Sequence, residues 1–73
     1  MKKVYRMKDL ECANCAAKME RAIQKIEGVR SVSISFMAQR LTIECEDDRL
    51  QEIMAKAQAC VKKVEPDAEI LGV

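Results

Sequence analysis

Hydrophobic and polar residues alternate in three stretches of the chain. In residues 4–9, Tyr5 and Met7 fall on one face and charged residues fall on the other. Residues 29–36 and 41–46 repeat this pattern, with apolar positions at Val32, Ile34, Phe36, Leu41, Ile43 and Cys45. A period of two is typical of strands with one buried face. Because only residues 37–40 separate the last two stretches, we expect those two strands to form a hairpin.

Two longer stretches have apolar residues spaced three and four apart, which predicts amphipathic helices. The first covers residues 15–27, with Asn14 as its expected N-cap and Gly28 at its C-terminal end. The second begins near Asp48, which is expected to form a capping box with Gln51, and ends at Pro66. The apolar faces are Ala16, Met19, Ile23 and Ile26 in the first helix and Leu50, Ile53, Met54, Ala57, Val61 and Val64 in the second.

A short final strand at residues 69–71 completes the order β-α-β-β-α-β. Two strand–helix–strand units around a hairpin predict the α+β, ferredoxin-like sandwich. Its four-stranded antiparallel sheet carries both helices on one face. At 73 residues, the chain has room for one domain, which we expect to span residues 1–73.

Composition narrows the possible functions. Thirteen basic and 12 acidic residues give a net charge of +1, and there is one Tyr, one Phe and no Trp. Neither the charge nor the aromatic content favours a nucleic-acid partner. No apolar run reaches the roughly 18 residues of a membrane span, and the N-terminus lacks the apolar stretch of a signal peptide. We therefore expect a cytoplasmic protein that is not inserted in a membrane.

Cysteines carry the candidate chemistry. They stand at positions 12, 15, 45 and 60, and the chain has no histidine. Without histidine there is no Cys–His catalytic pair. In a reducing compartment, a C-x-x-C pair indicates metal binding or redox chemistry rather than a structural disulfide. We expect no catalysis by this chain alone.

The pair Cys12 and Cys15 opens the first predicted helix. The N-terminus of a helix offers free N–H groups and a positive dipole end, so both thiolates are expected to be favoured there. Soft sulfur ligands select Cu(I), Zn(II) and Cd(II) over magnesium or calcium. A closed zinc site needs four ligands, and the chain has neither a second C-x-x-C nor a histidine pair. The expected site is therefore open and suited to transfer of the ion.

Two other interpretations of the pair remain open. The cysteines are either small buried apolar residues or the reactive pair of a small dithiol oxidoreductase. The chain is shorter than a thioredoxin-like domain, and its intervening dipeptide is Ala13-Asn14.

The segment DLECANCAAKMERAIQKIEGVRSVSISF, followed by a strand and a helix, resembles the heavy-metal-associated domain. The resemblance covers nearly the whole chain. The family's loop usually reads Gly-Met-x-Cys-x-x-Cys, whereas Asp9 and Leu10 stand here in place of Gly and Met. The resemblance implies that Leu10 fills the same apolar anchoring role as the usual Met. Such domains occur as free metallochaperones and as cytosolic N-terminal modules of heavy-metal P-type ATPases. The resemblance implies that Cys12 and Cys15 bind the metal.

Glu11 precedes the first cysteine and bears on the choice of metal. Zn(II) and Cd(II) prefer four ligands and accept a carboxylate oxygen beside sulfur, whereas two thiolates satisfy Cu(I). The resemblance points the same way, since the zinc, cadmium and lead members often carry an acidic residue here. We predict Zn(II), Cd(II) or Pb(II) as cargo, bound by Cys12, Cys15 and Glu11. A Cu(I) metallochaperone is the alternative.

The remaining candidates have weaker support. Glu65 lies in the charged loop VKKVEPDAEI after the second helix and is a possible further ligand, alone or in a metal-linked dimer. We expect Cys45 to lie in the core and Cys60 to pack beside it, and the alternative for Cys60 is a further sulfur ligand near the site. The partners implied are the metal ion and the other domains of a P-type ATPase, to which the chain delivers the ion or whose activity it regulates.

Overall fold

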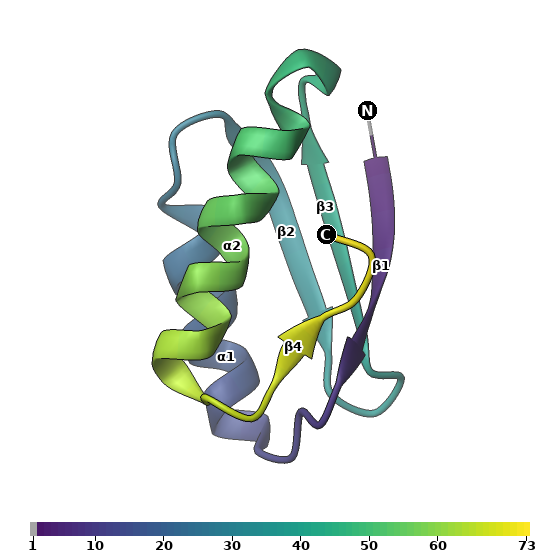
Figure 1. Cartoon of the computed structure of the whole chain (residues 1–73), viewed down its shortest axis with the longest axis vertical. Helices are drawn as coiled ribbons and strands as arrows, with labels where there is room; N and C mark the ends of the chain where they lie inside the picture. The colour runs from purple at the N-terminus through teal and green to yellow at the C-terminus, as the bar shows by residue number, and fades with distance from the viewer. Residues whose placement is uncertain (1) are drawn as a thin grey trace.

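A computed structural model describes residues 2–73 of the 73-residue chain. Four strands form one sheet: β1 (Lys2–Lys8), β2 (Val29–Ser35), β3 (Arg40–Cys45) and β4 (Glu69–Ile70). Their order in the sheet is β2-β3-β1-β4, and all neighbouring strands are antiparallel. Because β1 lies next to β3, the connection from β1 to β2 passes over β3 (Figure 1). This is the predicted ferredoxin-like arrangement.

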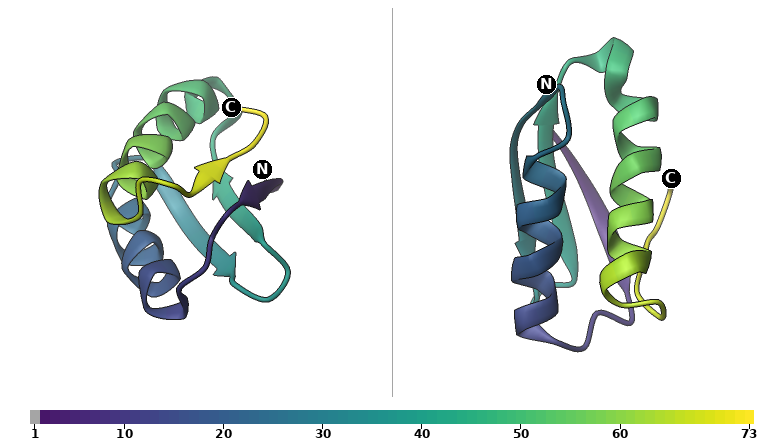
Figure 2. Two further views of the ribbon diagram at one scale, coloured as in Figure 1. Left: turned by 60° about the horizontal axis from the view of Figure 1, so that its bottom comes forward. Right: turned by 90° about the vertical axis from the view of Figure 1, so that its left-hand side faces the viewer.

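Two helices cover one face of the sheet. Helix α1 (Ala13–Gln24) follows β1, and α2 (Leu50–Val64) follows β3 after a single 3₁₀ turn, η1 (Asp47–Arg49). Figure 2 shows both helices on the same side of the strands. Of residues 2–73, no helix is long and apolar enough to cross a membrane.

The core lies between this helical layer and the sheet. Its residues come from the inward positions of the strands and the apolar faces of the two helices, as the sequence predicts. The largest fully buried side chains are Met19, Ile23, Leu41, Ile43, Cys45, Ile53, Val61 and Ile70. Charged side chains are absent from this core among residues 2–73. Apolar burial therefore dominates the packing that holds the two layers together.

Several predicted boundaries are wrong. Helix α1 begins at Ala13 with Cys12 as its N-cap, so Asn14 lies inside the helix. It ends at Gln24, because the backbone N–H groups of Lys25 and Ile26 bond three residues back and tighten the chain into a turn. The expected capping box of α2 is absent. Arg49 is the N-cap there and makes no side-chain capping bond, since η1 precedes the helix.

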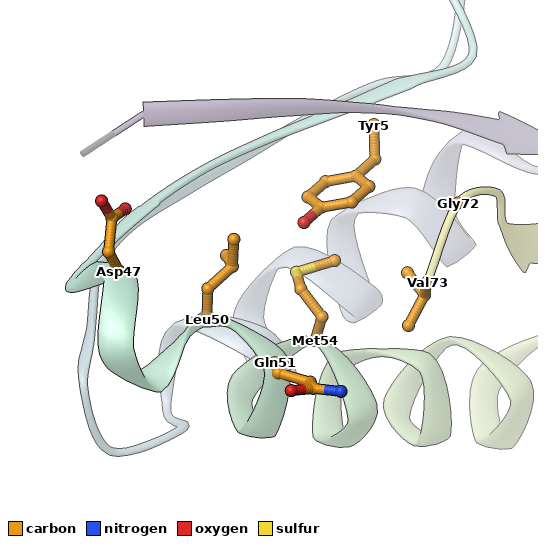
Figure 3. Close-up of a pocket in the computed structure, with 7 residues that line it drawn as sticks. All are labelled: Tyr5, Asp47, Leu50, Gln51, Met54, Gly72 and Val73. Atoms are coloured by element: carbon orange, nitrogen blue, oxygen red, sulfur yellow. The ribbon is translucent and has the colours of Figure 1, made fainter.

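A cavity of about 320 Å³ lies between β1 and the start of α2. Figure 3 shows the Tyr5 ring, Leu50 and Met54 pointing toward one another across it, with Asp47 at its edge. The chain beyond β4 closes one side, through Gly72 and Val73. Burial raises the pKa of Tyr5, and the neighbouring Cys45 raises it further. This cavity is mainly apolar and lies toward the N-terminal end of β1.

Candidate metal centre

The C-x-x-C pair lies at the N-terminus of α1, after the loop that follows the C-terminal end of β1 (Figure 1). Cys12 is the N-cap and has an extended backbone, with φ −134° and ψ 117°. Its Sγ accepts a hydrogen bond of 3.2 Å from the backbone N–H of Cys15. The first intrahelical bond, from Ala16 N to Cys12 O, measures 3.0 Å. Sulfur thus takes the capping role that a serine or aspartate oxygen fills in most helices.

The loop before Cys12 is anchored by Leu10, of which only 2% is exposed. This confirms the sequence interpretation that Leu10 supplies the loop's apolar anchor. Asp9, which stands where the family usually has glycine, has a positive φ of 57°. The loop therefore keeps a left-handed backbone without a glycine, a conformation that aspartate tolerates better than most side chains.

Gln39, in the turn between β2 and β3, holds this loop from the outside. Its side-chain amide accepts from Leu10 N at 3.1 Å and donates to Leu10 O at 2.6 Å. Sequence analysis missed this residue. A glutamine in a turn is ordinary, and 29 positions separate it from Leu10, so no local pattern identifies the contact.

The two thiols do not have equal pKa values. A hydrogen bond from the Cys15 side chain, together with the Cys15 backbone N–H, lowers the pKa of Cys12. The same side-chain bond raises the pKa of Cys15, because Cys15 donates its proton to the Cys12 sulfur. The expectation of two favoured thiolates is therefore corrected: the helix end lowers the pKa of Cys12, whereas the pKa of Cys15 is raised.

Two glutamates lie within reach of this part of the chain and differ in environment. Glu11 is exposed to solvent. Glu65, the C-cap of α2, is partly buried, and its Oε1 has no hydrogen-bond partner among residues 2–73. The negative charge of Glu65 contributes to the raised pKa of Cys15 and opposes the lowering of the Cys12 pKa. Glu65 therefore acts electrostatically on the thiol pair from a second element of the fold.

Three or more metal-binding side chains are not preassembled anywhere in the described part of the chain, residues 2–73. The geometry instead supplies two partly exposed thiols at a helix end and a carboxylate close enough to influence them. Soft sulfur ligands of this kind bind borderline and soft metal ions, and binding displaces the protons that the thiols carry.

The other cysteines have the packing roles that the sequence predicts. Cys45 is 2% exposed, and burial raises the pKa of its thiol. Cys60 is partly buried and packs against the core cluster from α2. The buried methionines Met7, Met19 and Met54 belong to the same core, whereas Met37 is 90% exposed in the turn. The methionines of residues 2–73 therefore form no thioether site.

Comparison with known proteins points to one family. The sequence model of the heavy-metal-associated domain matches residues 4–63. A cadmium, zinc and cobalt-transporting ATPase of Bacillus subtilis (strain 168) is 29% identical over 70 residues, which cover 96% of this chain and 10% of the ATPase. A probable cadmium-transporting ATPase of Listeria monocytogenes is 47% identical over 45 residues, 62% of this chain and 6% of that protein. The chain thus spans a tenth or less of these relatives.

Solved structures share the fold. A structure described as a CopZ metallochaperone superposes with a TM-score of 0.75 at 13% sequence identity, covering 97% of this chain and 100% of the other. At this identity the likeness establishes the arrangement of strands and helices alone. It agrees with the antiparallel sheet and paired helices described above.

Proposed function

Because the chain belongs to the heavy-metal-associated domain family, we propose that residues 1–73 form one domain that carries Zn(II), Cd(II) or Pb(II) as cargo. Cys12 and Cys15 bind the ion as thiolates, and Glu11 supplies an oxygen. The domain itself performs no catalysis. Its task is to hold an ion and release it to a protein partner.

The observation that carries this proposal is the partly buried carboxylate of Glu65, whose charge acts on the thiol pair. A buried carboxylate oxygen without a hydrogen-bond partner is costly unless a ligand satisfies it. A divalent ion bound by two thiolates offers that partner. Cu(I) is satisfied by two sulfurs and gains little from an oxygen, whereas Zn(II) and Cd(II) accept one in a larger shell. Glu65 therefore supports a divalent cargo and adds a second candidate oxygen to that of Glu11.

The family relatives support a role in metal export. Two of them bear names that describe cadmium transport, and both are far longer than this chain. We propose that the domain lies on the cytosolic side of such a P-type ATPase, either within the same chain or as a separate protein, and delivers the ion to it or regulates it. An open thiolate site suits this task, since a partner's thiolate binds the ion before Cys12 or Cys15 leaves.

Competitive titration of the reduced protein tests the proposal. Zn(II), Cd(II) and Cu(I) are each titrated against a chelator of known affinity in the wild type, Glu11→Ala and Glu65→Ala. Glu27→Ala is the matched control, because Glu27 is an exposed glutamate beyond the other end of α1. We expect Cd(II) affinity to fall roughly tenfold or more in Glu11→Ala and in Glu65→Ala, with Cu(I) affinity unchanged in both. Tight Cu(I) binding together with weak Cd(II) binding, insensitive to both glutamates, contradicts the proposal.

A further inference from the structure

We infer that Gln39 is a positioning residue for the metal site: its side-chain amide fixes the backbone of Leu10 and thereby sets the geometry of Cys12. This inference rests on the proposed metal-binding function and extends it to a residue outside the C-x-x-C loop. Gln39 lies in the β2–β3 turn, at the same end of the sheet as the loop between β1 and α1 (Figure 1).

The contact is a two-point clamp on one residue. Gln39 Oε1 accepts from Leu10 N at 3.1 Å, and Gln39 Nε2 donates to Leu10 O at 2.6 Å. Leu10 lies between β1 and α1, so its backbone groups belong to neither element. Its side chain is 2% exposed, which pins the residue from the inside. The Gln39 amide therefore supplies the hydrogen-bond partners of the Leu10 N–H and C=O. In most segments, water or a neighbouring strand or helix supplies such partners.

Further bonds fix Gln39 itself. Its Nε2 also donates to Phe36 O at 2.9 Å within the turn. Its own carbonyl accepts from Met7 N at 2.8 Å, next to the end of β1. The turn is thus joined to the loop through both the backbone and the side chain of one residue. A rigid support of this kind limits the motion of Cys12, two positions after Leu10.

Backbone strain is concentrated at the same junction. Among residues 2–73, the non-glycine residues with positive φ are Asp9 (57°) and Gln39 (53°), and they lie on the two sides of the clamp. Left-handed backbone at ordinary residues persists where the surrounding structure enforces it, and such strain is common at ligand sites. A glycine at position 39 would adopt the positive φ without strain, but it has no side-chain amide to hold Leu10. The side chain of Gln39 therefore has a role that the turn alone does not require.

The fold contains a matched control. Gln58 on α2 makes the same pair of bonds to one backbone residue, accepting from Ile70 N at 2.8 Å and donating to Ile70 O at 2.9 Å. This second clamp joins α2 to β4, and its two hydrogen bonds go to Ile70 rather than to the loop 9–15. Replacing either glutamine with alanine removes the same pair of side-chain hydrogen bonds to one backbone residue. Only the Gln39 clamp bonds directly to Leu10 in the loop before Cys12, whereas Ile70 pairs with Met7 inside the sheet.

The experiment compares Gln39→Ala, Gln39→Gly and Gln58→Ala in the reduced 73-residue chain. Cd(II) alone is the probe, titrated against a competing chelator and followed by the cadmium–thiolate absorption. We expect Cd(II) affinity to fall roughly 10- to 100-fold in both Gln39 variants, the range for residues that orient metal ligands. Gln58→Ala should stay within about twofold of the wild type while losing stability. Gln39→Gly controls for misfolding of Gln39→Ala. Glycine adopts the positive φ at position 39 without strain, so this variant should fold while still lacking the amide.

Hydrogen exchange of the metal-free proteins provides an independent readout. The Leu10 amide should exchange faster in both Gln39 variants and at the wild-type rate in Gln58→Ala. The inference is overturned if Gln39→Gly binds Cd(II) as tightly as the wild type, or if Gln39→Ala and Gln58→Ala weaken binding equally. A failure of the proposed function looks different. In that case the wild type itself does not bind Zn(II) or Cd(II), and if it binds Cu(I) instead, the same three variants test the clamp with that ion.

Discussion

Cys12 and Cys45 lie toward opposite ends of the same sheet and have opposite surroundings. Cys12 caps a helix at the loop end, where hydrogen bonds from Cys15 lower its pKa. Cys45 ends β3 near η1, where burial raises its pKa and leaves 2% of the residue exposed. The same side chain is thus a proposed metal ligand in one place and a core residue in the other. The difference lies in access to solvent and in the donors that face the sulfur.

The largest expected effect is on metal binding at the loop end. Cys12→Ser and Cys15→Ser should each lower Cd(II) affinity by more than the roughly 100-fold that a supporting residue can cost, because each removes a ligand itself. Cys45→Ser should leave the affinity unchanged. Chelator competition monitored at the cadmium–thiolate band measures all three. Equal losses in the Cys45 and Cys12 variants contradict the division of roles between the two ends.

The same substitutions should have the reverse order of effect on stability. In the metal-free protein, Cys45→Ser places a hydroxyl in the core and should lower the free energy of unfolding by about 1–3 kcal/mol. Cys12→Ser should change it by less than about 0.5 kcal/mol, since serine is a good N-cap and the site is partly exposed. Urea denaturation followed by circular dichroism gives both values. The comparison fails if Cys12→Ser lowers the free energy of unfolding more than Cys45→Ser does.

Residues with positive φ lie at both ends of the sheet, and substitutions at them should have smaller effects on stability. Gly28 has φ 98°, and an added Cβ would lie 3.1 Å from both Arg49 Nη1 and Ile53 Cδ1. Gly28→Ala should therefore cost about 1–2 kcal/mol. Asp9→Gly, at a φ of 57° in the loop, should leave stability within about 1 kcal/mol of the wild type, since glycine fits this backbone but loses more entropy on folding. Thermal unfolding of the two variants checks the difference.

The smallest expected effects concern pH. Folding raises the pKa of Cys45, so the fold favours its neutral thiol. The resulting stability is fully present below the unfolded-state pKa near 9.0 and is lost as the pH rises through the folded-state pKa. Cys12 has the opposite sign: its lowered pKa adds stability above the ordinary thiol pKa, and that stability is lost on acidification.

Alkylation by iodoacetamide, followed by mass spectrometry from pH 6 to 10, reads these differences directly. Cys12 should react at the lowest pH, Cys15 next and Cys45 last, because the thiolate is the reacting form and Cys45 is also buried. A buried, unreactive Cys12 would be inconsistent with the proposed role of the loop. Urea denaturation of the wild type and Cys45→Ala above pH 9 isolates the contribution of the buried thiol to stability.

Much of the fold follows from the spacing of residues along the chain. The alternation Leu41, Ile43, Cys45 predicts an inward-facing strand, and all three are buried. The helical spacing of Met19 and Ile23 is equally reliable, since one period of the helix places both on one face. Helix ends are less reliable, because capping depends on which side chain meets the free N–H groups. Cys12 rather than Asn14 caps α1 for this reason.

The candidate site divides in the same way. The sequence by itself determined that Cys12 and Cys15 open a helix and that Cys45 belongs to the core, because short-range spacing sets both. The family resemblance added that Leu10 anchors the loop before the pair. Only the tertiary structure decided that Gln39 holds Leu10, that the charge of Glu65 acts on the thiols and that the pKa values of the two thiols shift in opposite directions. The first two interactions join residues far apart in the chain, and the third depends on how the two side chains face each other at the helix end. Chain folding creates such interactions, and no local period encodes them.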